Sequence, residues 1–291
     1  MRVTEQAIIA SAKGTVGQHP MYKLDRVSKV FDGRIVAVDE LDLKVRRGEK
    51  LALIGPSGAG KTTLFRMLNL TIPPTSGTLL FDGLDIGRLY GRRLREVRRR
   101  IGTVYQQHNL VPRLQVVHNV LSGKLGAWPL WRAVRSLIRP AEADLAFEAL
   151  SQVGIPEKLY DRTETLSGGQ QQRVAIARTL VQNPEVILAD EPVSSVDPAL
   201  AAGIVKLLIE LSETYRKTLI MNLHSVDLAL AYFPRVIGLR DGKILFDLPA
   251  AEVTDEHLAT LYAGSQTETT EEVTGRAELR PVRACQPHLT S

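Results

Sequence analysis

The stretch "GPSGAGKT", residues 55 to 62, decides the fold because it matches the phosphate-binding pattern G-x-x-x-x-G-K-T. In such a loop the backbone amides surround phosphate oxygens, the lysine neutralises their charge and the hydroxyl binds Mg²⁺. The stretch follows the apolar run "LALIG" at 51 to 55 and opens "KTTLFRMLNL", whose pattern indicates a helix. A strand, a glycine-rich loop and a helix in this order predict an α/β core that binds nucleotide phosphates.

Two further runs, "EVILADE" at 185 to 191 and "TLIMNLH" at 218 to 224, are continuously apolar and read as buried parallel strands. The first ends in Asp190 and Glu191 and the second in His224, so all three are expected at the ligand-binding edge of the sheet. There Asp190 suits Mg²⁺, Glu191 suits a base that orients or deprotonates water, and His224 suits the γ-phosphate and the attacking water. A solvated turn for the two acids and a structural histidine are the alternatives.

The remaining chain divides by pattern. Alternating segments before residue 87 contain three turn pairs and predict antiparallel strands: Asp32-Gly33, Arg47-Gly48 and Asp82-Gly83. Residues 109 to 165 lean towards helix, with "PAEADLAFEALSQVG" at 140 to 154 the clearest one and Gly154 its expected stop. A last hairpin turns at Asp241-Gly242. Residues 1–20 are expected to be an extension, 21–264 one domain, and 265–291 a disordered tail.

The stretch "LSGGQQQRVAIARTL", residues 166 to 180, places two glycines in the first turn of an amphipathic helix. Ser167 and Gln170 fit a capping box, but a capping box does not require Gly168 and Gly169, which each cost about 1 kcal/mol relative to alanine. Uncovered amides at the positive end of a helix dipole suit an anion. A helix cap alone and a second phosphate-binding site therefore remain alternative interpretations of this segment.

Composition limits the function classes. The chain has 291 residues, of which 44% are hydrophobic, which suits one substantial core. No apolar run approaches the roughly 20 residues that span a bilayer, and the N-terminus is not typical of a secretory signal. The single cysteine, Cys285, excludes an intramolecular disulfide and suits a reducing compartment. A net charge of +5 is by itself weak evidence for nucleic acid or membrane binding.

The P-loop, "LSGGQ", "ILADEP" and a histidine after the next strand, in this order, resemble the ATP-binding subunits of ABC transporters. The resemblance runs from about Tyr22 to Gly264. It implies the ABC ATPase fold: a P-loop NTPase core with a parallel sheet, an N-terminal antiparallel β subdomain and an inserted helical subdomain at about 109–172. It also implies hydrolysis of ATP to ADP and phosphate, with ATP and Mg²⁺ bound.

Residue roles follow from the resemblance. Phe31 in "SKVFDG" matches the aromatic that stacks on adenine, and Gln106 in "IGTVYQQHNLVP" matches the glutamine that senses Mg²⁺. Asp197 in "SSVDP" matches the aspartate that links two active sites. Glu191, His224, Lys61 and Gln106 are the implied catalytic residues, and Thr62, Gln106 and Asp190 the implied metal contacts. The implied nucleotide-binding loop comprises Gly55, Pro56, Ser57, Gly58, Ala59, Gly60, Lys61, Thr62 and Thr63.

The resemblance gives a use for the glycines at 168 and 169. In this family two chains pair head to tail, and the segment matching Leu166, Ser167, Gly168, Gly169 and Gln170 closes on the ATP of the partner subunit. The implied assembly is a homodimer with two transmembrane permease subunits and an extracytoplasmic solute-binding protein. Within that assembly this chain would lie peripherally at the cytoplasmic face of the inner membrane, and no nucleic-acid partner is expected.

A narrower resemblance, to the ATP-binding subunits of phosphonate importers, rests on longer stretches: "RRIGTVYQQHNLVPRL", "NVLSGKLG", "SGGQQQRVAIARTL", "ILADEPVSSVDP", "LHSVDLAL" and "VIGLRDGKILFD". It implies uptake of phosphonate or a related oxyanion. Ser195, Val196 and Ser225 depart from the residues more common in that group. An importer ATPase for phosphate, methionine or polar amino acids is the first alternative. A soluble ABC protein is less favoured, since no paired ATPase domain or long coiled coil is visible, and a P-loop kinase leaves "LSGGQ" unexplained.

Three other features have open interpretations. The basic run "GRRLREVRRR" at 91 to 100 suits a solvated helix face or lipid head groups. Trp128 and Trp131 suit either the core or contact with a permease. His108 and His118 lack metal-ligand spacing and are expected to be structural.

Overall fold

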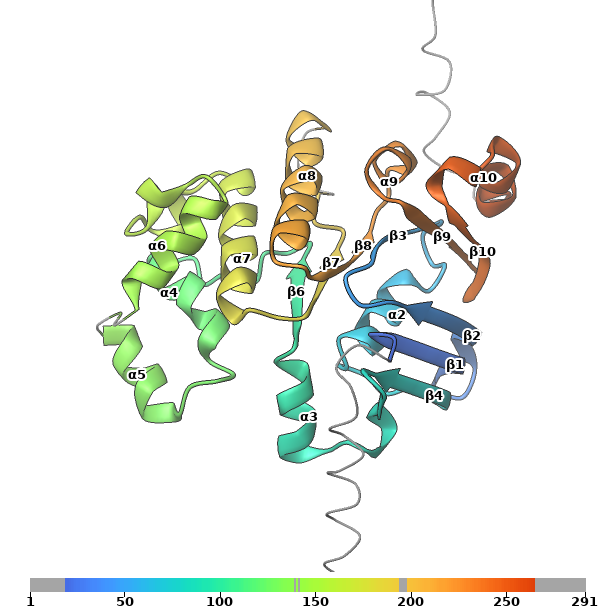
Figure 1. Ribbon diagram of the computed structural model, residues 1–291, viewed down its shortest axis with the longest axis horizontal. Helices are drawn as coiled ribbons and strands as arrows, with labels where there is room; N and C mark the ends of the chain where they lie inside the picture. The colour runs from blue at the N-terminus through green and yellow to red at the C-terminus, as the bar shows by residue number, and fades with distance from the viewer. Residues whose placement is uncertain (1–18, 139, 141, 194–197, 265–291) are drawn as a thin grey trace, which may run out of the picture.

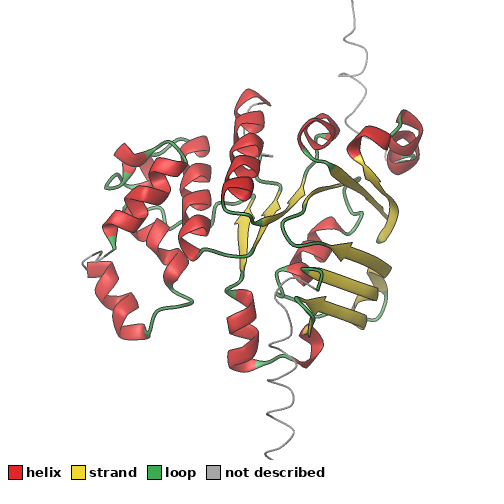
Figure 2. Cartoon of the chain, in the orientation of Figure 1, coloured by secondary structure: helices red, strands yellow, loops and turns green. Residues whose placement is uncertain are grey.

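The computed structural model describes residues 19–138, 140, 142–193 and 198–264. Its centre is a six-stranded sheet in the order β10-β9-β3-β8-β7-β6, drawn in yellow in Figure 2. All neighbouring pairs are parallel except the hairpin of β9 and β10. The three apolar runs are confirmed as its buried strands β3, β7 and β8. The strand bounds are β3 Lys50–Ile54, β6 Ile101–Tyr105, β7 Val186–Asp190, β8 Thr218–Asn222, β9 Arg235–Arg240 and β10 Lys243–Pro249.

The expected antiparallel strands form a second sheet in the order β2-β1-β4-β5. Both residues of the Asp32-Gly33 turn have positive φ, 50° and 67°, as do both residues of Asp82-Gly83, 51° and 77°. Turns of this hand match the twist of the strands they join. The strands are β1 Tyr22–Phe31, β2 Ile35–Val45, β4 Ser76–Phe81 and β5 Leu84–Asp85.

The two faces of the central sheet are covered by different parts of the chain. Successive residues of a strand point to opposite faces, so Leu51 and Leu53 of β3 join one core while Ala52 and Ile54 join the other. The first core also contains α2 and the antiparallel sheet, and the second contains α7 and α8. These helices are α2 Lys61–Leu68, α7 Gly168–Gln182 and α8 Pro198–Thr214. The helix of the phosphate loop and the helix of "LSGGQ" therefore lie on opposite faces.

A group of helices, coloured green to yellow, fills one end of the molecule, and the antiparallel strands lie towards the other end (Figure 1). The helix expected from residue 140 begins at Ala143, after Glu142 at its cap position. Its expected stop is confirmed, because Gly154 has φ 76° and its amide bonds to the carbonyl of Ser151. This group contains α4 Val116–Leu121, α5 Leu130–Ile138 and α6 Ala143–Gln152. The helices elsewhere in the chain are α3 Gly91–Arg98, α9 Val226–Tyr232 and α10 Asp255–Tyr262.

Short 3₁₀ helices connect these elements: Ile86–Arg88, Ser122–Lys124, Pro156–Lys158, Thr163–Thr165 and Ala250–Glu252. The basic run forms α3 and the residues after it, and most of its side chains are exposed, as the solvated-face interpretation expects. Trp128 packs partly against the core, whereas Trp131 is 65% exposed. Within the described ranges, no helix is long and apolar enough to cross a membrane.

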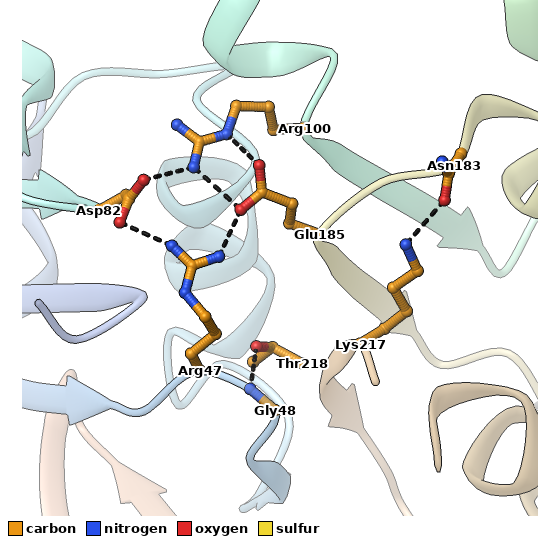
Figure 3. A network of polar contacts seen from close by, with 8 residues as sticks. All are labelled: Arg47, Gly48, Asp82, Arg100, Asn183, Glu185, Lys217 and Thr218. Carbon is orange, nitrogen blue, oxygen red and sulfur yellow. Dashed lines mark hydrogen bonds and ion pairs between the residues drawn. The ribbon is translucent and has the colours of Figure 1, made fainter. Parts of the chain in front are cut away.

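A network of two arginines and two carboxylates ties the two sheets together (Figure 3). Arg47 follows β2, Asp82 lies in the β4–β5 turn, Arg100 precedes β6 and Glu185 precedes β7. Arg47 lies 2.7 Å from Asp82, and Arg100 lies 2.9 Å from Glu185, with further short contacts closing the ring. Burial alone raises the pKa of Glu185, but its bonds to Arg100 and Arg47 outweigh burial, and the net shift is downward.

We predict that Glu185→Gln lowers the free energy of unfolding by about 1–2 kcal/mol at neutral pH, because two half-buried guanidinium groups lose their carboxylate. Since the folded pKa is lowered, the contribution is present above the unfolded pKa and disappears as the pH falls through the folded pKa. The measurement is urea unfolding at pH 7 and at a series of pH values below 4. Glu96→Gln is the control, since its pair with Arg92 is exposed and worth at most about 0.5 kcal/mol. Equal losses for the two variants would contradict the prediction.

Candidate nucleotide site

The phosphate loop joins β3 to α2 and has a backbone that needs glycine at defined positions. Gly55, Gly58 and Gly60 have φ of 151°, 80° and 99°, which side chains rarely adopt. A Cβ at Gly55 would lie 2.0 Å from the carbonyl oxygen of Leu239, and one at Gly60 would lie 2.2 Å from that of Ala37. A Cβ at Gly58, which is exposed, would meet no neighbouring atom within 4 Å. Gly55 and Gly60 are thus required for packing, and Gly58 for conformation.

Neighbouring strands hold this loop from two sides. The amide of Gly242, in the β9–β10 turn, donates to the carbonyl of Ala59 at 3.0 Å. The carbonyl of Gly242 accepts from the amide of Asp39 in β2 at 2.9 Å. Strand β2 is therefore fixed beside the loop, and Phe31, which ends β1, belongs to the same hairpin. The ring of Phe31 is partly exposed, with the Lys29 ammonium 5.3 Å from its centroid.

Lys61 begins α2 and turns its ammonium back into the loop. Its Nζ donates to the carbonyl of Gly55 at 2.6 Å and to that of Pro56 at 2.9 Å. Burial lowers the pKa of Lys61, while the charges of Glu191 and Asp190 act in the opposite direction. The loop thus presents a buried cation and exposed positions at Ser57, Gly58 and Thr62. This arrangement fits a phosphate chain.

The strand register aligns the predicted residues at one edge. Tyr105 of β6 pairs with Asp190 of β7, and Asp190 pairs with Asn222 of β8. Gln106 and Glu191 each follow their strand by one residue, and β3, next to β8, leads into the phosphate loop. Gln106 is exposed and lines a cavity of about 360 Å³ with Thr163 and Gln171. The expected meeting of these strand ends is confirmed by the sheet.

Glu191 and His224 form a close pair. His224 Nε2 lies 2.7 Å from Glu191 Oε1, and the Glu191 side chain is 17% exposed against 50% for His224. Glu191 has φ 49°, a left-handed conformation that is uncommon for a residue with a side chain. Its amide donates to the carbonyl of Asn222 at 3.2 Å, which fixes this backbone. A carboxylate paired with a partly exposed histidine is suited to hold and move a proton.

Asn222 is a site residue that the sequence argument missed. Its side-chain amide, fully buried, donates to Asp190 Oδ1 at 2.8 Å and lies 3.4 Å from Glu191 Oε1. Burial raises the pKa of Asp190, and the Asn222 amide and the Lys61 charge act against that rise. A signal was present, because an asparagine is out of place in the otherwise apolar run "TLIMNL".

The segment "LSGGQ" forms the predicted capping box. Ser167 Oγ accepts from the amide of Gln170 at 3.3 Å, and Gln170 Oε1 accepts from the amide of Ser167 at 3.0 Å. The two glycines differ: a Cβ at Gly169 would lie 2.5 Å from Leu200 Cδ2, whereas Gly168 is exposed with open space beside it. A side chain at Gly169 would therefore require the end of the Leu200 side chain to move, whereas Gly168 has open space beside it.

This segment stays apart from the phosphate loop of its own chain. Within the described residues, no hydrogen bond or ion pair joins 166–170 to 55–63. Their helices cover opposite faces of the sheet. Asp197 lies outside the described residues, as do Ser195, Val196 and Cys285. No group of three or more His, Cys, Asp or Glu able to hold a metal occurs in the described part of the chain.

The comparisons with known proteins agree with this geometry. The family model described as "ABC transporter" matches residues 38–194, more than half of the chain. The chain belongs to the ABC transporter family. A phosphonates import ATP-binding protein of Pseudomonas syringae pv. syringae is 46% identical, with 87% of this chain and 95% of that protein covered. One of Lactobacillus acidophilus is 42% identical, with 84% and 95% covered. The predicted family and its narrower resemblance are confirmed.

Solved structures confirm the predicted fold class. Part of an ABC transporter complex from Clostridium perfringens has a TM-score of 0.71 and 28% identity, with 84% of this chain and 95% of that one covered. A dimeric ATP-binding cassette in a post-hydrolysis state, bound to ADP and Pi, has a TM-score of 0.67 and 32% identity, with 79% and 99% covered. The predicted transporter-type ATPase is thereby confirmed for the chain.

We predict that Asn222→Ala lowers the free energy of unfolding by about 2 kcal/mol at pH 7, because the buried Asp190 carboxylate loses its amide donor. Ionised Asp190 opposes folding, since its folded pKa is raised, and this penalty is relieved as the pH falls through the folded pKa. The loss in Asn222→Ala should therefore shrink in acid. Denaturant unfolding from pH 7 to pH 4 measures it. Asp190→Asn combined with Asn222→Ala is the control and should show no such trend.

Proposed function

We propose that this chain is the ATP-hydrolysing subunit of an ABC importer and that it couples hydrolysis to uptake of a phosphonate or a related oxyanion. The observation that carries the hydrolytic part is the 2.7 Å pair of Glu191 and His224 at the strand edge beside the phosphate loop. The choice of solute is supported by the names of the relatives, which cover most of the chain at 42% to 47% identity.

The residues divide the work by position. The loop from Gly55 to Thr63 binds the phosphates through its amides and Lys61, whose ammonium exchanges its carbonyl partners for phosphate oxygens. Glu191 orients the attacking water and accepts its proton, and His224 holds the Glu191 carboxylate and contacts the γ-phosphate. Phe31 stacks on the adenine. In this family such an assignment follows the motif positions, and the geometry above is compatible with each of them.

Mg²⁺ bound with ATP neutralises phosphate charge during transfer. Thr62, Gln106 and Asp190 would face it, and they are spread over the start of α2 and the ends of β6 and β7. Mg²⁺ is usually held by one or two protein groups plus substrate phosphates, which suits a chain without a closed metal cage in its described part. Asn222 keeps the Asp190 carboxylate oriented towards this edge through its 2.8 Å bond.

A second copy of the chain would complete the site. The exposed Ser167 and Gly168 lie at a helix N-terminus that faces no phosphate loop of its own chain, and such an end suits the γ-phosphate bound by a partner. Leu166, Gly169 and Gln170 shape that turn, and Asp197 would link the two sites. We place this homodimer on two permease subunits at the cytoplasmic side of the membrane, with a solute-binding protein delivering the solute.

We predict that Glu191→Gln keeps the affinity for ATP within about twofold but lowers kcat by at least about 100-fold, because the phosphate loop survives while the water loses its base. Lys61→Ala, by contrast, should weaken nucleotide binding as well, since phosphate charge loses its cation. Binding of a fluorescent ATP analogue and steady-state phosphate release measure the two effects. Near-normal turnover by Glu191→Gln would exclude the proposed role.

The solute is tested with the assembled transporter. We predict that a binding protein loaded with a phosphonate stimulates ATP hydrolysis severalfold over the unloaded binding protein, because solute delivery favours the closed nucleotide-bound dimer. The same binding protein with phosphate, methionine or a polar amino acid is the comparison. Stimulation by one of these and not by any phosphonate would show that the proposed solute is wrong, while the proposed role in ATP hydrolysis would stand.

A further inference from the structure

Arg178, on α7, donates hydrogen bonds to the loop that carries Gln106. Its Nη1 donates to the carbonyl of Asn109 at 2.7 Å, and its Nη2 donates to that of His108 at 3.0 Å. Both acceptors lie within three residues of Gln106, which follows β6. Helix α7 lies beside β6 (Figure 1), and its N-terminus carries the "LSGGQ" segment. One side chain thus joins the helix of that segment to the loop after β6.

The position is unusual for an arginine. Its side chain is partly buried, and within the described chain it hydrogen-bonds to two backbone carbonyls. Burial lowers the pKa of Arg178, which means that the charged guanidinium is less favourable at this position than in water. A planar guanidinium can reach two successive carbonyls at once, whereas a lysine ammonium offers no such fork. The contact therefore depends on arginine geometry rather than on charge alone.

A second anchor holds the same loop a few residues on. Asn119, 3% exposed on α4, accepts from the amide of Val111 at 2.8 Å and donates to the carbonyl of Val111 at 3.0 Å. Its Nδ2 also donates to Thr163 Oγ1 at 2.8 Å, and Thr163 lies three residues before Leu166. Residues 108 to 111 are thus hydrogen-bonded to the helical part at both ends. At the second end, Asn119 also bonds to Thr163, which lies just before the "LSGGQ" turn.

We propose that Arg178 is a positioning residue that holds Gln106 at the sheet edge through its bonds to the loop after β6. Arg178 itself touches no reacting atom. The inference rests on the proposed function, because Gln106 has a role only if that edge binds the nucleotide.

The test compares Arg178→Gln with Arg173→Gln in the full chain. Arg173 lies on the same helix and its Nη1 donates to the carbonyl of Val153 at 2.5 Å, far in sequence from Gln106. Arg178→Gln is expected to lower kcat about tenfold and to raise the Mg²⁺ concentration for half-maximal activity, with the KM for ATP within about twofold. Arg173→Gln should leave all three near wild type. Arg178→Lys should behave like Arg178→Gln.

A double-mutant cycle separates positioning from simple stability. If Arg178 acts through the loop, adding Arg178→Gln to Gln106→Ala produces no further loss of kcat. Multiplicative losses, or an unchanged Mg²⁺ requirement in Arg178→Gln with wild-type melting, would overturn the inference. If Arg178→Gln fails to fold, the same cycle with Arg178→Lys decides. If Gln106→Ala alone is fully active, the proposed role of Gln106 fails, which is a different outcome.

Discussion

Close packing of backbone carbonyls against two glycines shapes the phosphate loop, and the site depends on it. Carbonyl oxygens of Leu239 and Ala37 occupy the space where side chains at Gly55 and Gly60 would stand. The loop therefore packs between the β9–β10 hairpin and β2, and the amide of Gly242 donates a hydrogen bond to the carbonyl of Ala59. Because the antiparallel sheet and the central sheet both contribute, the loop has its shape only when the two sheets are docked. The Arg47–Asp82–Arg100–Glu185 ring holds them together at the opposite ends of the strands.

The same sheet separates two tasks. One face carries α2 and the phosphate loop, and the other carries α7 with the helical part. Side chains alternate along each strand, so a single buried strand such as β3 serves both cores. The separation leaves the "LSGGQ" turn at a distance from the chain's own phosphate loop, and the link between the two runs through the strand ends and the loop that Arg178 holds.

The sequence was informative where local geometry dictates residue type. Asp32-Gly33 and Asp82-Gly83 predicted their turns because few other pairs adopt two positive φ values, and continuous apolar runs predicted the parallel strands. Contacts between distant segments were not predictable. Nothing local in "TLIMNL" tells which carboxylate Asn222 meets, and the space at Gly169 is taken by Leu200, thirty-one residues later in the chain. The start of α6 was misplaced for a related reason, because propensity does not tell which residue becomes the cap.

Because Tyr105 pairs with Asp190 and Asp190 pairs with Asn222, the sheet sets the spacing of the residues at this edge. Neighbouring strands lie about 4.8 Å apart, so the last strand residues, Asp190 and Asn222 among them, are spaced by backbone hydrogen bonds rather than by loop conformation. The strand spacing at this edge does not depend on the outward-facing residues of the helices that cover the sheet. The outer surface of the helical part can therefore change in sequence while the spacing of the strand ends stays the same.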